Sequence, residues 1–148
     1  MGLYGTFATD GDLEKTGVWF DYGDFRVLAG FSGGSNKKYT AYAEKMFKPL
    51  RRAIDTGSLG NERSLSVLIE VFSHTIIFNW ETKQKDESGI EHWVQGIENK
   101  EGDLIEFTKE NVIITFTALP NLFADIQSQC AMISNYRNRD LEEESKNS

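Results

Sequence analysis

The sequence lacks most features that mark secreted or membrane-spanning proteins. Cys130 is the only cysteine among 148 residues, so no internal disulfide can form and we expect a reducing compartment. The longest mainly apolar run, residues 66–80, is interrupted by polar residues and is shorter than the roughly 20 residues that span a bilayer. The first five residues lack the basic and apolar stretches of a signal peptide. We therefore expect a cytoplasmic protein with no membrane partner.

Positive charge is also scarce. The chain carries 16 Lys and Arg residues against 23 Asp and Glu residues, a net charge of −7. Phosphate contacts dominate the affinity of proteins for nucleic acid, so this balance disfavours a nucleic-acid partner.

The sequence also lacks the common catalytic, metal-binding and phosphate-binding motifs. His74, His92 and Cys130 are far apart and belong to no HxxxH, CxxC or HExxH pattern. Ser73 precedes His74 but lies outside any GxSxG elbow. The glycine-rich stretch 30–38 lacks the GxxxxGK[ST] spacing of a phosphate-binding loop. We therefore predict no catalytic residue, no cofactor and no metal site, so the protein is expected not to be an enzyme.

One segment, residues 35–55, has the opposite charge to the rest, and we call it the basic segment. Its apolar residues are spaced by three and four, which predicts an amphipathic helix. Its net charge is +4, so the remainder of the chain carries −11. The candidate partner-binding residues are its six cations, Lys37, Lys38, Lys45, Lys48, Arg51 and Arg52.

The basic segment has two interpretations. The cations can cover apolar surface with their stems and offset carboxylates in neighbouring hairpins. Alternatively, their clustered charge attracts an acidic partner and raises its association rate. The sequence alone leaves both open. Pro49 lies within the segment and predicts a kink near Phe47.

The pattern along the chain predicts an α+β fold, mainly α, with about four helices packed with two small β-hairpins in a single domain. Hydrophobic residues make up 39% of the chain and aromatic residues 12%, enough for a core in a chain of this length. We expect a flexible lead-in over 1–15, a globular domain over 16–138 and a charged tail over 139–148. The expected hairpins are 18–29, around a Gly23-Asp24 turn, and 91–107, and the polar residues 81–90 are expected to form a loop. The expected helices are the basic segment, 62–80, 109–117 with Thr108 as its cap, and a last helix that begins at Pro120 and whose apolar face continues to Ile133 or Arg137.

Seven segments together resemble the tail assembly chaperones of bacteriophages with long, flexible tails. Their order and approximate spacing match that family over about residues 16–147. The segments are Trp19–Gly23, Ser35–Tyr39, Lys48–Arg52, Asn79–Glu81, Phe107–Asn111, Leu119–Ile126 and Leu141–Asn147. Residues 83–105 look longer than in many members of that family.

The resemblance implies a non-enzymatic protein of the host cytoplasm. Such chaperones bind and solubilise the helical tape-measure protein, help recruit subunits of the major tail (tube) protein, and leave before the tail is complete. Self-association is compatible with this role. Two alternatives stay open: a structural component of the virion, such as a head–tail connector or tail-completion protein, and a small nucleic-acid-binding regulator.

Overall fold

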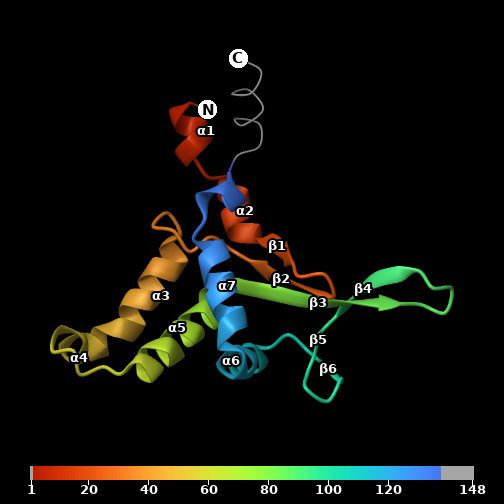
Figure 1. Cartoon of the computed structure of the whole chain (residues 1–148). Helices are drawn as coiled ribbons and strands as arrows, with labels where there is room; N and C mark the ends of the chain where they lie inside the picture. The colour runs from red at the N-terminus through yellow and green to blue at the C-terminus, as the bar shows by residue number, and fades with distance from the viewer. Residues whose placement is uncertain (1, 138–148) are drawn as a thin grey trace.

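Helices cover one face of a four-stranded antiparallel sheet (Figure 1). The structure is a computed structural model and describes residues 2–137; the predicted tail, 139–148, lies outside them. The first half contains α1 (Leu3–Phe7), α2 (Gly11–Thr16), β1 (Val18–Asp21), β2 (Phe25–Ala29), α3 (Lys37–Phe47), the 3₁₀ helix η1 (Lys48–Leu50) and α4 (Arg51–Asp55). The second half contains α5 (Asn61–Thr75), β3 (Ile77–Lys85), β4 (Glu91–Gln95), β5 (Ile97–Glu98), β6 (Leu104–Ile105), α6 (Lys109–Ala118), α7 (Pro120–Cys130) and the 3₁₀ helix η2 (Ile133–Tyr136).

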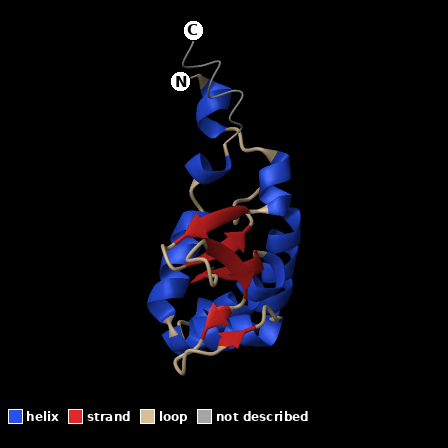
Figure 2. Cartoon of the chain, turned by 90° about the vertical axis from the view of Figure 1, so that its right-hand side faces the viewer, coloured by secondary structure: helices blue, strands red, loops and turns tan. Residues whose placement is uncertain are grey.

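The main sheet has the strand order β1-β2-β3-β4. Val27 pairs with Phe20 on one side and with Trp80 on the other. Because successive side chains of a strand alternate between faces, this register places Phe20, Val27 and Trp80 on the same face. Strands β5 and β6 form a separate two-stranded sheet that lies below the main sheet in Figure 2.

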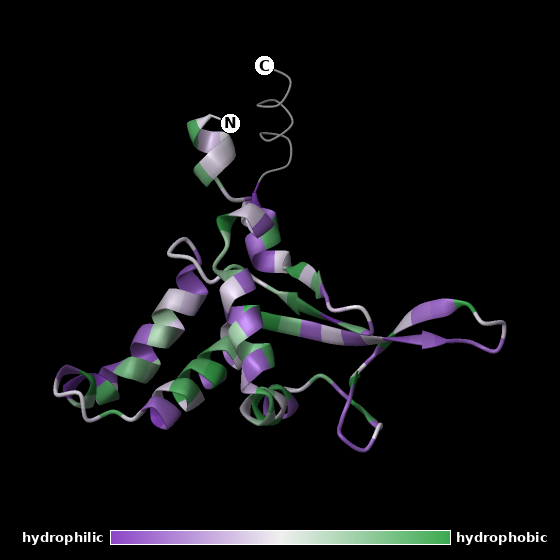
Figure 3. Cartoon of the chain, viewed as in Figure 1, coloured by the Kyte–Doolittle hydropathy of each residue, from purple (hydrophilic) through white to green (hydrophobic). Residues whose placement is uncertain are grey.

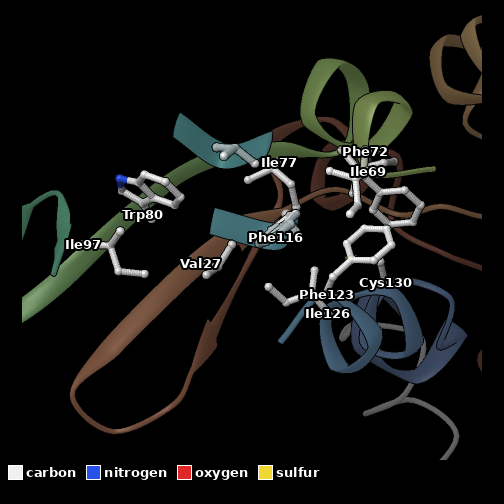
Figure 4. Close-up of a cluster of buried hydrophobic side chains, with 13 residues drawn as sticks. Val27, Ile69, Phe72, Ile77, Trp80, Ile97, Phe116, Phe123, Ile126 and Cys130 are labelled. Atoms are coloured by element: carbon white, nitrogen blue, oxygen red, sulfur yellow. The ribbon is translucent and has the colours of Figure 1, made fainter. Parts of the chain in front are cut away.

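The core lies between the inner face of the main sheet and α5, α6 and α7. Val27 and Trp80 are fully buried on the sheet side. On the helix side, the Phe123 ring lies between Phe72 of α5 and Phe116 of α6, with ring centroids 5.3 and 5.4 Å away (Figure 4). The two ring contacts of Phe123 therefore join three helices.

The outer face of the main sheet, unlike the apolar inner face, has a charged residue, Arg26, at the centre of its side-chain contacts. The Arg26 guanidinium lies 4.1 Å from the ring centroid of Trp19 and 4.4 Å from that of Trp93. Its Nε also donates a hydrogen bond of 2.9 Å to Glu81. Cation–π contacts and an ion pair thus connect β1, β2, β3 and β4 across this face.

Several predictions from the sequence are confirmed. The first hairpin forms over Val18–Ala29, and its turn contains Gly23 at φ +96°, a conformation that favours glycine. Thr108 caps α6 by accepting a hydrogen bond of 3.0 Å from the Asn111 amide. Pro120 begins α7. The predicted interruption near Phe47 is present, because η1 separates α3 from α4.

The predicted fold class, about four helices with two small hairpins, is wrong. Residues 2–137 form seven α-helices and two 3₁₀ helices, and the first hairpin is half of a four-stranded sheet. The helix expected over 62–80 ends at Thr75, and β3 begins at Ile77. The β-branched residues at this point favour a strand, and that preference outweighed the helical spacing.

The second predicted hairpin is also wrong in its pairing. Residues 91–95 form β4 and pair with β3, so only 97–98 and 104–105 pair as expected within 91–107. The polar stretch 81–85, interpreted as a loop, completes β3. Its inward Thr82 is buried and donates a hydrogen bond of 2.8 Å to the Gly96 carbonyl, so a polar side chain occupies a core position.

Both ends of the described chain contain helical segments. Residues 2–15 of the expected lead-in contain α1 and most of α2. The last helix ends at Cys130, before the Ile133 to which its apolar pattern was expected to continue. Tyr136 then turns back into the core, where its hydroxyl donates to the carbonyls of Ala29 and Gly30 at 2.9 and 3.0 Å. Among the described residues, no helix is both long and apolar enough to cross a bilayer.

We predict that Phe123→Ala lowers the free energy of unfolding by about 3–5 kcal/mol, because Phe123 is fully buried between two other rings. Urea unfolding followed by circular dichroism measures this. Phe7→Ala removes the same atoms from a side chain that is 65% exposed, and should change stability by less than about 0.5 kcal/mol. Equal effects from the two variants would contradict the assigned core.

We predict that Tyr136→Phe lowers the free energy of unfolding by about 1–3 kcal/mol, since it leaves two buried carbonyls without their donor. Tyr4→Phe, at a side chain that is 72% exposed, is the matched control and should be neutral. Thermal unfolding of both variants tests whether the segment after α7 is anchored by this hydroxyl.

Candidate partner-binding surface

The basic segment forms an interrupted helix on one side of the molecule (Figure 1). Asn36 caps α3: its side-chain oxygen accepts from the Tyr39 amide at 3.1 Å, and its side-chain nitrogen donates to the Phe31 carbonyl at 2.6 Å. Tyr39 packs edge-on against Phe72, and Tyr42 stacks on His74. These contacts attach α3 to α5 through its apolar face, which leaves the cationic face outward.

All six predicted cations are exposed. None of them takes part in a salt bridge with another residue in the part of the chain that the structure describes. The Lys45 ammonium lies 6.0 Å from the centroid of the Tyr42 ring. The interpretation in which these cations offset carboxylates of the hairpins therefore finds no supporting ion pair in residues 2–137.

Two adjacent hollows border the start of α3. The first, of 570 Å³, is lined by Glu14, Lys15, Ser35, Asn36, Lys37, Lys38, Thr75 and Phe78. The second, of 400 Å³, is lined by Lys38, Ala41, Tyr42, Lys45, His74, Thr75 and Lys109. Lys38 and Thr75 line both hollows, so the two are neighbours, and each has lysine side chains in its lining.

The structure brings together only some of the predicted residues. Lys37, Lys38 and Lys45 line the hollows, whereas Lys48, Arg51 and Arg52 belong to η1 and α4 and line neither. The 3₁₀ turn at Pro49 has three residues per turn, so it breaks the seven-residue spacing that would align Arg52 with Lys45.

Two cations were missed from the sequence. Lys15 comes from α2 and Lys109 is the first residue of α6, and both join the surface around the hollows. Each lies outside the basic segment, and only the tertiary fold brings them to the hollows beside α3. The acidic residue of the first hollow, Glu14, already accepts hydrogen bonds from Thr9 and Ser35.

The side chains of His74, His92 and Cys130 each have separate local partners. His74 stacks on Tyr42. His92 of β4 forms a hydrogen bond of 2.7 Å with Asp86, which lies in the turn between β3 and β4. Burial raises the pKa of the Cys130 thiol to about 12, which keeps it protonated and unreactive at neutral pH. Among residues 2–137, no group of three His, Cys, Asp or Glu side chains lies close enough to hold a metal ion. The surface around α3 is suited to binding an anionic or acidic partner.

A comparison with models of protein families matches residues 34–147, more than three quarters of the chain, to the family described as YdaY prophage protein. No curated protein and no solved structure matches. The matched region begins just before the basic segment and includes every strand from β3 onward. The chain therefore belongs to the YdaY prophage protein family and is a phage-derived protein.

Proposed function

We propose that this phage-derived protein is a non-enzymatic tail assembly chaperone that works in the host cytoplasm. In this role it binds the tape-measure protein, keeps it soluble and helps recruit subunits of the major tail (tube) protein. The resemblance of seven ordered segments to that chaperone family motivates the proposal, and membership of a prophage family agrees with it.

The observation that carries the proposal is the surface around α3. Its exposed cations have no salt-bridge partner within residues 2–137, although the whole chain has a net charge of −7. Surface ion pairs contribute little to stability, so a cluster of uncompensated cations is not explained by folding. Such a cluster attracts acidic segments of a partner and speeds their encounter.

We predict that the double variant Lys38→Glu and Lys45→Glu folds normally but fails to keep the tape-measure protein soluble. Both side chains are exposed and line the second hollow, so stability should change by less than about 1 kcal/mol. Co-expression with a tape-measure fragment from the same phage, followed by centrifugation, measures the soluble fraction.

The matched control is Arg63→Glu with Lys85→Glu, two exposed cations that line neither the two hollows nor the pocket between α6 and the β5–β6 hairpin. Each double variant lowers the net charge by the same four units, so a general charge effect would act on both. Full solubility of the fragment with the α3 variant would reject the proposed surface. Loss of the soluble fragment with both double variants would show that the effect comes from the net charge.

Two further measurements separate the alternatives. Mass spectrometry of purified particles should find no copy of this chain, because a chaperone leaves before the tail is complete; its presence would favour a connector or tail-completion protein. A gel shift with a steep salt dependence would favour a nucleic-acid-binding regulator.

A further inference from the structure

Helix α6 carries apolar residues on its outer side as well as on the side that faces the core (Figure 3). Val112 and Phe116 face the core and are fully buried, yet Ile114 on the other side is 64% exposed. Leu119, directly after the helix, is 53% exposed. The stretch from Val112 to Leu119 contains no charged residue. Neighbouring large apolar side chains that are exposed on one surface often mark a contact site, so the outer side of α6 is a candidate contact surface.

This side of α6 forms one wall of a groove. The apolar groove, as we call it, has a volume of 760 Å³ and lies between α6 and the β5–β6 hairpin. Its apolar lining consists of Ile105, Ile114, Ala118 and Leu119. Its polar lining consists of Glu98, Asn99, Lys100, Glu101, Asn111 and Thr115.

Both walls are fixed to the body of the protein. On the hairpin side, the Trp80 indole donates to the Ile105 carbonyl at 3.2 Å, and Trp80 itself is fully buried. Gly96, at φ +110°, lies so close to this carbonyl that a Cβ atom would approach its oxygen to 3.0 Å. On the helix side, the Asn111 side chain donates to the Glu106 carbonyl at 3.0 Å. A groove held in this way needs little ordering when a ligand binds.

The rim of the apolar groove is acidic. Residues 98–106 contain Glu98, Glu101, Asp103 and Glu106 against the single cation Lys100. None of these carboxylates forms a salt bridge within residues 2–137. The charge is therefore opposite in sign to that of the basic segment, and the two surfaces suit different binding elements.

We propose that the apolar groove binds an amphipathic helix with Lys or Arg residues along the flanks of its apolar stripe. Its apolar side chains, spaced by three and four, pack on Ile114, Ala118 and Leu119, as in other helix-in-groove complexes. Its flanking cations lie beside Glu98 and Glu101. The proposal does not depend on the identity of the partner, and thus not on the function proposed above.

The test uses synthetic helical peptides of roughly 18 residues, a length that supports a helix in water. The first peptide carries a leucine stripe with lysine flanks, the second has glutamate flanks, and the third is a scramble of the first. Binding to the full chain is measured by fluorescence anisotropy. The lysine-flanked peptide should bind, while the scramble and the glutamate-flanked peptide should bind at least about tenfold more weakly.

Ile114→Glu should weaken binding of the lysine-flanked peptide by about tenfold or more, since it places a charge on the apolar lining. Ile90→Glu is the matched control: Ile90 is 58% exposed in the turn between β3 and β4, outside the groove, and should bind as the unmodified chain does. Equal affinity of Ile114→Glu and the unmodified chain, or equal loss in both variants, would overturn the proposal.

A charge reversal gives an independent readout. The double variant Glu98→Lys with Glu101→Lys should reverse the peptide preference of the groove, so that the glutamate-flanked peptide binds better than the lysine-flanked peptide. Both residues are exposed, so this variant is informative even if Ile114→Glu is poorly folded. An unchanged preference, or tight binding of the scramble, would show that the groove does not select a basic amphipathic helix.

Discussion

The structure depends most on the contact of three phenylalanine rings at the centre of the core. Phe123 of α7 lies between Phe72 of α5 and Phe116 of α6, and all three are buried. Since α5 also carries α3 through the Tyr39–Phe72 contact, the position of the basic segment depends on the same rings. The outer side of α6 is fixed likewise, because Val112 and Phe116 anchor its inner side. Both candidate surfaces are therefore held by one core.

The sequence correctly predicted the elements that depend on short-range signals, in which a residue determines the backbone geometry of residues close to it in the chain. The Gly-Asp turn, the Thr108 cap and Pro120 each determine backbone geometry within a few residues, and the corresponding elements are present. Strand β3 follows a local signal only at its start, where β-branched residues favour a strand. Its half beyond Trp80 is polar because one side faces solvent, and Thr82 occupies a core position through a hydrogen bond to a residue 14 positions away. Pairing between distant segments, and not local preference, makes this stretch a strand.

The same distinction applies to the candidate surface. The charge pattern of residues 35–55 is local and predicted an exposed cationic helix, which the structure contains. Lys15 and Lys109 join it only through tertiary packing, so no pattern along the chain could have indicated them. The apolar groove was missed for a related reason: the sequence showed a short, capped apolar helix but not which side of it the core would leave uncovered.

The basic segment and the acidic β5–β6 hairpin lie toward opposite ends of the molecule in Figure 1. A body with separated positive and negative regions has an electric dipole moment. A charged partner within the screening length of about 8 Å at physiological salt therefore experiences a torque as well as an attraction. The protein and its partner would rotate into a preferred mutual orientation before their surfaces touch.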